Sequence, residues 1–211
     1  MRYIHVDGKE FERTRKGKYN LITHESVYPP SEDSFFLIDN LDGLTKACHG
    51  IVAEPCTGSG MISIRLALEG ANVVSSDVNF FACYATKENL KENAPYYSAN
   101  VVCGDLLEFI RDGSLSCIVC NPPYLPEYEE GLDKFAWWKG GKTGIEAIAK
   151  LIISAKRTLS DGGKLSFLAS SLTDLEQVEN ILRENDFLIR GKVAKELPDE
   201  RLIIFEAVRK Q

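Results

Sequence analysis

The sequence lacks any apolar run that approaches the roughly 20 residues needed by a membrane-spanning helix. The segment Met1–His5 shows no signal-peptide core either. Basic residues are not in excess, since 25 Lys and Arg stand against 31 Asp and Glu, for a net charge of −6. The first two absences predict a cytoplasmic protein, with the nucleus as an alternative, that contacts no membrane. The third argues against binding nucleic acid through a global positive field.

A metal-binding pattern is also missing. Of the six cysteines, only Cys117 and Cys120 have a metal-like spacing, and no second pair or nearby histidine completes a zinc set. Both lie in an apolar run, so we predict buried, reduced thiols and no metal site. The segment Lys9–Lys18 is locally basic, although the chain as a whole carries a net negative charge. It fits a solvated arm, and it also fits a contact with a macromolecular substrate.

What the sequence does contain is a repeated alternation of short apolar runs and amphipathic stretches, which is typical of an α/β fold. We predict a seven-stranded, mostly parallel sheet with an antiparallel C-terminal strand and with helices on both faces. The predicted strands are Gly50–Glu54, Asn72–Ser76, Asn100–Cys103, Leu115–Cys120, Lys164–Ala169, Phe187–Val193 and Arg201–Val208. The predicted helices are residues 31–41, Met61–Glu69, Asn79–Asn93, Gly144–Leu159 and Thr173–Glu184. Residues 1–27 are predicted to be an extension, and residues 28–211 a single domain.

Three local signals set the predicted helix ends. Ser31 is the expected N-cap of the first helix, and the Thr173-x-x-Glu176 pattern is a capping box that should open the last helix. The helix Gly144–Leu159 is predicted to be the longest, because its apolar residues recur at helical spacing. The glycine-containing run Asp161–Gly163 should close it.

Three turns after successive predicted strands indicate a nucleoside-binding crevice. The first turn, Glu54–Gly60, contains glycines and opens a helix, so its backbone N–H groups can approach a ligand closely. Asp77 ends the second strand, where its carboxylate can accept hydrogen bonds from both hydroxyls of a ribose. Asp105 and Leu106 follow the third strand, where they can meet an adenine ring. Each turn alone can be a plain connection, and the first also resembles the fingerprint of dinucleotide-binding proteins.

The segment Asn121-Pro122-Pro123-Tyr124 follows the fourth strand and favours S-adenosylmethionine over a nicotinamide cofactor. An amide nitrogen is a poor nucleophile, because its lone pair is delocalised and a general base cannot usefully deprotonate it. Two oxygen acceptors, the Asn121 side chain and the Pro122 carbonyl, can instead hold the NH₂ group in line with the methyl–sulfur bond. Tyr124 supplies a flat surface for the planar group. Since hydride transfer needs none of this, we predict a methyltransferase that acts on a planar nitrogen.

The same residues resemble a known family. Asn121–Tyr124 together with Tyr28–Leu37 (Tyr-Pro-Pro-Ser-Glu-Asp-Ser-Phe-Phe-Leu) is similar to the HemK family of release-factor glutamine methyltransferases. Tyr28–Leu37 and Trp138–Gly144 look like the eukaryotic and archaeal branch of that family. The residues before Glu54 are also too few for the helical substrate domain of the bacterial relatives. Asn-Pro-Pro-Tyr alone is shared with adenine-N6 methyltransferases, so the combination carries the resemblance, which extends over nearly the whole chain.

The resemblance implies a class I, Rossmann-like methyltransferase that uses S-adenosylmethionine to methylate the glutamine of a Gly-Gly-Gln motif in the peptide-chain release factor. It implies that the release factor is presented with its GTPase partner, and that a small zinc-binding activator subunit forms a heterodimer with the enzyme. The catalytic residues are then Asn121, Pro122 and Tyr124. The implied cofactor contacts are Pro30, Ser34, Glu54, Gly58, Gly60, Asp77, Val78, Asp105, Leu106 and Asn121.

One departure from the family pattern is Cys56, at a position where the family usually has glycine. A Cβ there narrows the approach to the methionine end of the cofactor, which raises weak binding or a shifted turn as alternatives, and a small side chain is tolerated on the condition that φ stays negative. We assign Cys56 no nucleophilic role, since nothing near it in sequence would activate the thiol.

A physical argument also places the activator. The predicted strand Asn100–Cys103 should lie at an edge of the sheet, where unpaired backbone groups and the apolar Val101 and Val102 invite strand addition. We predict that the activator docks on this edge. Adenine N6 of nucleic acid and the amino group of a protein lysine are alternative methyl acceptors. A catalytically silent binding module of the translation apparatus is an alternative of a different class.

Overall fold

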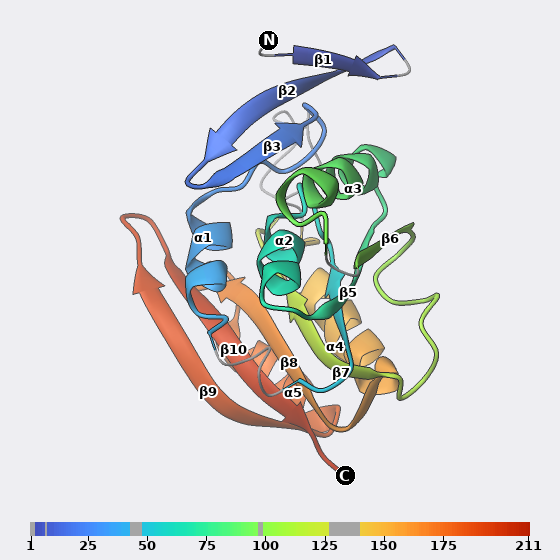
Figure 1. Cartoon of the computed structure of the whole chain (residues 1–211). Helices are drawn as coiled ribbons and strands as arrows, with labels where there is room; N and C mark the ends of the chain where they lie inside the picture. The colour runs from blue at the N-terminus through green and yellow to red at the C-terminus, as the bar shows by residue number, and fades with distance from the viewer. Residues whose placement is uncertain (1–2, 7, 43–47, 97–98, 127–139) are drawn as a thin grey trace.

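The computed structural model describes residues 3–6, 8–42, 48–96, 99–126 and 140–211. They form a seven-stranded sheet with helices on both faces and a three-stranded sheet near the N-terminus (Figure 1). The strands of the large sheet are β4 (Ile51–Pro55), β5 (Asn72–Asp77), β6 (Ala99–Cys103), β7 (Leu115–Cys120), β8 (Leu159–Ser170), β9 (Phe187–Glu196) and β10 (Arg201–Arg209). The seven predicted strands are therefore confirmed, with shifts at their ends.

The order of the large sheet is β6-β5-β4-β7-β8-β10-β9. All pairs formed within the set β4 to β8 are parallel. Strand β10 is antiparallel to both β8 and β9. Helices on both faces bury the central parallel strands, which accounts for the almost continuous burial along β7. Because the parallel strands point the same way, the carboxyl ends of β4, β5 and β7 meet at one edge and bring their following turns together. The predicted fold class is confirmed.

The helices are α1 (Glu32–Asp39), α2 (Met61–Leu68), α3 (Phe80–Asn93), α4 (Glu146–Thr158) and α5 (Leu175–Glu184). Figure 1 shows α1, α2 and α3 in front of the large sheet and α4 and α5 behind it. The prediction that the fourth helix is the longest is wrong, because α3 has 14 residues and α4 has 13. The helix α4 ends at Thr158 because Leu159 already pairs with Leu115 of β7. Residues 161–163 therefore lie inside β8 and do not close the helix.

One of the two predicted caps differs from the structure. Asp174 is the N-cap of α5, where its carboxylate accepts a hydrogen bond from the Gln177 N–H at 3.0 Å. Thr173 donates its hydroxyl to the Ser170 carbonyl at 2.7 Å, so it is used by the turn that leaves β8 and the predicted capping box is wrong. Ser31 does occupy the N-cap position of α1, but its side chain makes no capping hydrogen bond within the described structure.

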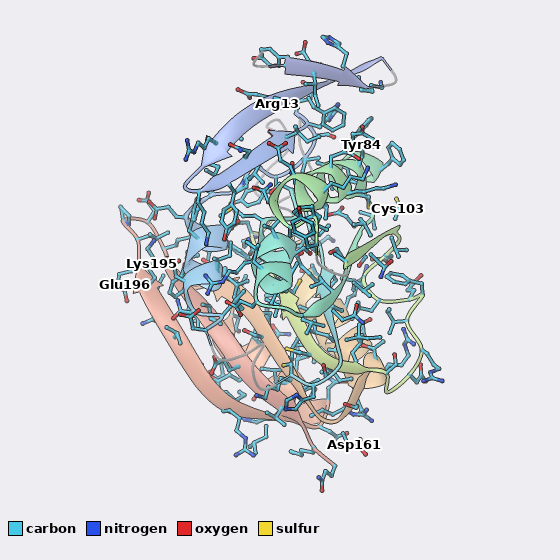
Figure 2. All side chains as sticks on the ribbon, in the orientation of Figure 1. Arg13, Tyr84, Cys103, Asp161, Lys195 and Glu196 are labelled. Atoms are coloured by element: carbon cyan, nitrogen blue, oxygen red, sulfur yellow. The ribbon has the colours of Figure 1, made fainter. Side chains whose placement is uncertain are left out.

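The N-terminal sheet consists of β1 (Tyr3–Val6), β2 (Lys9–Lys16) and β3 (Tyr19–Thr23), paired antiparallel, and the sequence does not predict it. Phe11 and Ile22 pack against Ala85 of α3. Asn89 of α3 bonds to both the N–H and the carbonyl of Ile22, at 2.7 and 2.9 Å. Basic side chains such as Arg13 are exposed, but they belong to an ordered strand and not to a solvated arm (Figure 2). A domain boundary at residue 27 stays a prediction.

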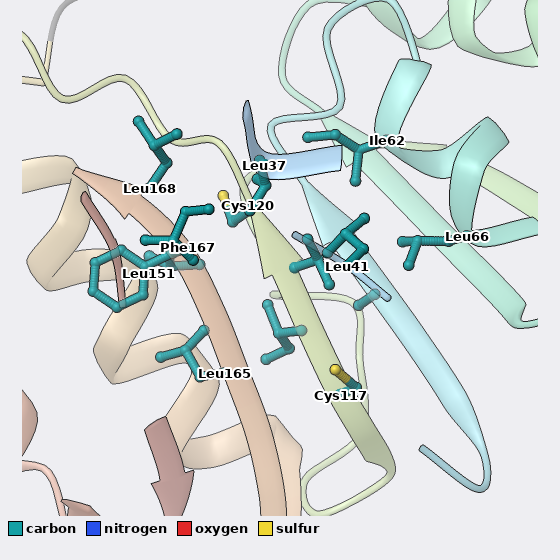
Figure 3. Close-up of a cluster of buried hydrophobic side chains, with 14 of the residues drawn as sticks. Leu37, Leu41, Ile62, Leu66, Cys117, Cys120, Leu151, Leu165, Phe167 and Leu168 are labelled. Atoms are coloured by element: carbon teal, nitrogen blue, oxygen red, sulfur yellow. The ribbon is translucent and has the colours of Figure 1, made fainter. Parts of the chain in front are cut away.

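The main core lies between the large sheet and its helices, and Figure 3 shows Leu37, Leu151 and Phe167 among its side chains. Cys117 and Cys120 are buried in it as free thiols, which confirms their predicted burial. In the described part of the chain, no three His, Cys, Asp or Glu side chains are grouped as they would be around a metal ion. No helix in that part is long and apolar enough to cross a membrane.

Candidate active site

A cavity of about 540 Å³ lies at the carboxyl ends of β4, β5 and β7. The residues that line it belong to four segments, within residues 26–34, 54–62, 77–82 and 121–125. Ligands of doubly wound sheets bind at this edge, because the turns that follow the strands present polar side chains and free N–H groups there. The cavity volume is in the range usual for small-molecule sites. The fold therefore gathers the main candidate residues in one pocket.

The turn between β4 and α2 is one wall of the cavity. Gly58 and Gly60 both have positive φ, +55° and +79°. A Cβ at Gly60 would lie 2.8–2.9 Å from atoms of Thr86 in α3, so only glycine allows this close approach. The Thr86 hydroxyl in turn donates to the Gly58 carbonyl at 3.1 Å. The glycines of this turn therefore serve the packing of α3 as well as the approach of a ligand.

We expect Gly60→Ala to lower the free energy of unfolding by about 3 kcal/mol or more, because left-handed strain of about 1–2 kcal/mol adds to the overpacking against Thr86. Gly162→Ala is the matched control, since Gly162 has φ +74° and no atom within 4 Å of an added Cβ. Its free energy of unfolding should fall by the contribution of left-handed strain alone. Urea unfolding of the two variants measures the difference, and equal losses would contradict a packing role for Gly60.

Cys56 has a φ of +58°, a left-handed conformation that costs energy for residues other than glycine. The condition set for an easily tolerated side chain, a negative φ, is therefore not met. The turn keeps a glycine-like geometry although a cysteine occupies it. The Cys120 thiol donates to the neighbouring Pro55 carbonyl at 3.2 Å, which brings β7 against this turn. Cys56 also lines the cavity, so the strained residue belongs to the cavity wall.

Cys56→Gly should raise the free energy of unfolding by about 1 kcal/mol, because glycine removes the left-handed strain at some cost in chain entropy. Cys56→Ala removes the thiol but keeps the strain, and it should not be stabilised. Thermal unfolding of both variants separates the two contributions. A lower midpoint for Cys56→Gly than for Cys56→Ala would show that the left-handed strain at this position is smaller than the chain-entropy cost of glycine.

Asp77 closes β5 and lines the cavity. Its carboxylate accepts hydrogen bonds from the N–H groups of Gly58 at 3.0 Å and Asn79 at 2.9 Å. Burial raises the pKa of Asp77, and these N–H groups oppose the shift. Asn79 also caps α3 by accepting from the Phe81 N–H at 2.9 Å. The carboxylate is thus held between the glycine turn and α3, where the predicted contacts with a ribose would be made.

Glu54, at the end of β4, is only 1% exposed. The hydroxyls of Thr57 and Ser63 both donate to its Oε2, that of Thr57 at 2.9 Å. Its Oε1 is buried and has no hydrogen-bond partner among the described residues, although Glu54 lines the cavity. Burial raises the pKa of Glu54 to about 8. A buried carboxyl oxygen without a partner is a place that a cationic ligand group can fill.

Asn121, Pro122 and Tyr124 follow β7 and line the cavity. The Asn121 amide is oriented by its Nδ2, which donates to Asp33 Oδ2 at 2.9 Å. Its Oδ1 is buried and has no partner in the described structure. The Tyr124 hydroxyl also donates to Asp33, at 3.2 Å, and burial raises the pKa of Tyr124. This segment therefore holds an unsatisfied acceptor, Asn121 Oδ1, in a residue of the cavity wall.

Most of the predicted site residues come together in the structure. Those that line the cavity are Pro30, Ser34, Glu54, Gly58, Asp77, Val78, Asn121, Pro122 and Tyr124. Gly60, Asp105 and Leu106 are not among the described residues that line it. Gly60 lies against Thr86, Asp105 is exposed, and the Leu106 carbonyl accepts a hydrogen bond from Ser76. The cofactor contacts of these three residues stay predictions without support from the cavity.

Two residues of the site are missed by the sequence argument. Asp33 in α1 is 5% exposed, and the Tyr28 hydroxyl donates to its Oδ2 at 2.9 Å. Both belong to the segment Tyr28–Leu37, which the sequence singles out as a motif. A motif does not show which element lies beside it, and here α1 lies beside the turn after β7.

The segment Trp138–Gly144 is described only from Gly140 onward, because Trp138 and Lys139 lie outside the described residues. Its glycines pack against the segment that follows β7. A Cβ at Gly140 would lie 2.8 Å from the Pro123 carbonyl oxygen, and one at Gly144 would collide with the Tyr124 carbonyl oxygen. The glycines of this segment therefore allow the chain to pass close behind Asn121–Tyr124.

A sheet of this order, with a glycine turn after β4 and an acidic residue at the end of β5, defines the class of Rossmann-like methyltransferases that use S-adenosylmethionine. The family model described as the methyltransferase small domain matches residues 19–192. A protein of Methanocaldococcus jannaschii, named for protein N5-glutamine methyltransferase activity, is 34% identical over 190 residues, which cover 88% of this chain and 93% of the relative. The chain belongs to the methyltransferase small domain family, in its HemK group of protein-glutamine methyltransferases.

A second relative agrees with this assignment, and a solved structure agrees with the fold. The eRF1 methyltransferase catalytic subunit mtq2 of Schizosaccharomyces pombe is 28% identical over 208 residues, covering 88% of this chain and 90% of the relative. Among solved structures, the Mtq2–Trm112 complex of E. cuniculi matches with a TM-score of 0.68 at 24% identity, covering 88% of this chain and 99% of that chain. At that identity the structural match shows the fold alone.

Proposed function

We propose that this chain transfers a methyl group from S-adenosylmethionine to the side-chain amide nitrogen of the glutamine in the Gly-Gly-Gln motif of a peptide-chain release factor. The observation that carries the proposal is the buried, unpartnered Oδ1 of Asn121 in the cavity wall. A glutamine NH₂ group is a neutral donor that satisfies this oxygen. The M. jannaschii and S. pombe relatives, named for N5-glutamine and eRF1 methylation, support this substrate.

The described residues fit S-adenosylmethionine. The cofactor carries a cationic ammonium group, and Glu54 offers a buried carboxyl oxygen that lacks a partner. Asp77 offers a carboxylate to the ribose. Further contacts in the cavity wall are proposed for Pro30, Ser34, Gly58 and Val78. When bound, the cofactor supplies an electrophilic methyl group.

The contribution of the protein to the reaction is to orient the amide and to stabilise the positive charge that develops on it. Asn121 Oδ1 accepts one N–H of the substrate, and we assign the other N–H to the Pro122 carbonyl. Two fixed acceptors turn the nitrogen toward the methyl donor and interact more strongly as its charge grows. Burial raises the pKa of Tyr124, so its phenol stays protonated at neutral pH and serves as a surface, not as a base.

Methyl incorporation from labelled S-adenosylmethionine tests this function. The reaction contains the release factor with its GTPase and the activator, and mass spectrometry locates the label. We expect label on the Gly-Gly-Gln glutamine and none on a release factor in which that glutamine is replaced by glutamate. Cofactor binding with label only on nucleic acid or on a lysine-containing peptide would overturn the substrate and keep the methyltransferase.

For the activator, we propose docking of a small zinc-binding subunit on β6. Among the described strands, β6 pairs with β5 alone and is an edge of the large sheet. Figure 2 shows Cys103 at the end of β6, on the outer side of the molecule. The exposed apolar side chains of Val78 and Phe109 lie in the turns that follow β5 and β6, and that of Phe80 lies at the start of α3. An edge flanked by apolar side chains favours strand addition by a partner.

Changing Val101 and Val102 of β6 together to Lys should weaken activator binding more than about 10-fold, since two charges would be buried on docking. Cofactor affinity should be retained, because these residues do not line the cavity. Leu188→Lys on β9, at the opposite edge, is the control, since Leu188 is an exposed apolar residue of the other edge strand. Activator binding that survives the change on β6 in a pull-down titration would contradict docking on this edge.

A further inference from the structure

Five hydrogen-bond donors converge on Asp33, which has no role in the reaction proposed above. Its Oδ2 accepts from the Tyr28 hydroxyl at 2.9 Å, from Asn121 Nδ2 at 2.9 Å and from the Tyr124 hydroxyl at 3.2 Å. Its Oδ1 accepts from the Ser34 N–H at 2.6 Å and from the Ser34 hydroxyl at 3.2 Å. The group is almost fully buried, so these contacts replace water. The residue therefore connects α1 with the turn after β7.

This set of donors requires a group that only accepts. A carboxylate offers about four lone-pair sites and no donor, whereas an amide would turn an NH₂ group toward at least one of the donors. Hydrogen bonds to a charged acceptor are also stronger than neutral ones. Burial and then the charge of Asp33 raise the pKa values of Tyr28 and Tyr124, so both phenols keep their protons and remain donors.

The consequence for Asn121 follows from the shape of its amide. The two ends of an amide have nearly the same size, so hydrogen-bond partners decide which end faces which way. Since Nδ2 of Asn121 points at Asp33, its Oδ1 is directed away from Asp33 and is left without a partner. We infer that Asp33 is a positioning residue that holds Asn121 with its acceptor toward the substrate, and so selects substrates that donate a hydrogen bond from nitrogen. This inference rests on the proposed methyl transfer to an NH₂ group and deepens it.

Asp33→Asn is the direct test, because it preserves shape and removes the acceptor-only character. With its NH₂ at the position of Oδ2, the substituted amide favours a flipped Asn121 that turns its own NH₂ toward the substrate. We expect kcat to fall about 100-fold, the scale of losing one oriented hydrogen-bonding group, with the cofactor Kd changed less than about threefold. Asp39→Asn, at the exposed end of the same helix, should leave both unchanged.

A double-mutant cycle separates positioning from a general structural role. If Asp33 acts through Asn121, adding Asp33→Asn to Asn121→Ala should lower kcat only slightly further. Two independent losses that multiply would overturn the inference. Asp33→Glu keeps the charge and displaces it by one methylene, and it should recover part of the kcat lost in Asp33→Asn.

The orientation of Asn121 can also be measured without substrate. This measurement is independent of the methylation assay that tests the proposed function. In a ¹⁵N–¹H spectrum of the whole chain, the side-chain NH₂ signals of Asn121 are assigned by their absence in Asn121→Ala. We expect Asp33→Asn, or Asp33→Glu if the first variant does not fold, to shift these signals, and Asp39→Asn to leave them in place. Unshifted signals would overturn the inference. A wild-type enzyme that puts no label on glutamine would instead remove the proposed substrate, and the spectrum would still decide whether Asp33 orients Asn121.

Discussion

Asn121→Ala should lower the rate of methyl transfer by about 10²- to 10³-fold. The reason is that Oδ1 is a buried acceptor in the cavity wall without a protein partner, so its removal leaves the substrate amide without the group that orients it. Cofactor affinity should change by less than about threefold, because the methyl acceptor and not the cofactor is the main partner of that oxygen. Single-turnover rates at saturating substrate measure the first effect, and calorimetric titration of S-adenosylhomocysteine measures the second.

Asn121→Asp distinguishes the acceptor from its orientation. This variant keeps an oxygen toward the cavity but sets a second carboxyl group against Asp33 where the wild type has an NH₂ donor. Two carboxylates this close cannot both ionise readily, so the pair retains a shared proton to a higher pH than either group alone. Below that raised pKa the shared proton restores the donor, and activity should partly return at acidic pH. The exposed Asn180→Ala on α5 is the control. A wild-type rate in Asn121→Ala would refute the acceptor role.

Glu54→Gln should have opposite effects on cofactor binding and on stability. It retains an acceptor for the hydroxyls of Thr57 and Ser63, and it replaces the unpartnered oxygen by an NH₂ group. That group cannot accept a hydrogen bond from a cationic ligand, and unlike the carboxyl group it cannot release a proton to become negatively charged when the ligand binds. We therefore expect the affinity for S-adenosylhomocysteine to fall by about 10-fold or more, the scale of a lost hydrogen bond to a charged group. Calorimetric titration measures this loss.

The stability of the unliganded enzyme should move the other way. Burial raises the pKa of Glu54 to about 8, well above the value of about 4.3 for glutamate in an unfolded chain. Between these values the folded state holds a proton that the unfolded state has released, so stability falls as pH rises from about 4.3 to about 8 and is level above that. Glu54→Gln has no such proton. Its unfolding midpoint should be higher than that of the wild type at pH 8 and close to it at pH 5.

Glu184→Gln, on an exposed residue at the end of α5, is the control for both measurements. It should leave the pH dependence of unfolding and the cofactor affinity at the wild-type values. Parallel pH dependence in the wild type and in Glu54→Gln would show that Glu54 is ionised in the folded protein at neutral pH. A cofactor affinity equal to that of the wild type would remove Glu54 from the proposed binding residues.

Several features of the fold are predictable because they depend on local pattern. Apolar runs such as Leu115–Cys120 can only be stable when buried on both faces, so the strand is predicted with its observed bounds. The turn after it carries Asn121 and Tyr124, whose residue types by themselves point to amide chemistry. The glycine turn and Asp77 are predictable for the same reason, since each stands where a strand ends.

Other features depend on contacts between distant segments. The N-terminal sheet is not predicted, because a single aromatic, Phe11, stands among charged residues and its burial requires α3 as a partner. The φ of Cys56 could not be predicted from the sequence because it is set by the turn as a whole, in which Pro55 meets the Cys120 thiol on β7. The prediction that Asp161–Gly163 closes the fourth helix is wrong for a similar reason. Leu159 already pairs with β7, so the helix ends at Thr158, before these residues are reached.

The class of fold, the glycine turn with Asp77 and the Asn121–Tyr124 segment could be predicted from residue type and spacing, because each depends on one stretch of chain. Which buried acceptors lack a partner among the described residues follows from the packing of the folded chain, because hydrogen-bond satisfaction depends on neighbours that are far apart in sequence. Asp33 and Asn121 are separated by 88 positions, yet their contact at 2.9 Å orients the amide. The unpartnered oxygens of Asn121 and Glu54 are left by the same packing, and they point to the ligands that the cavity takes.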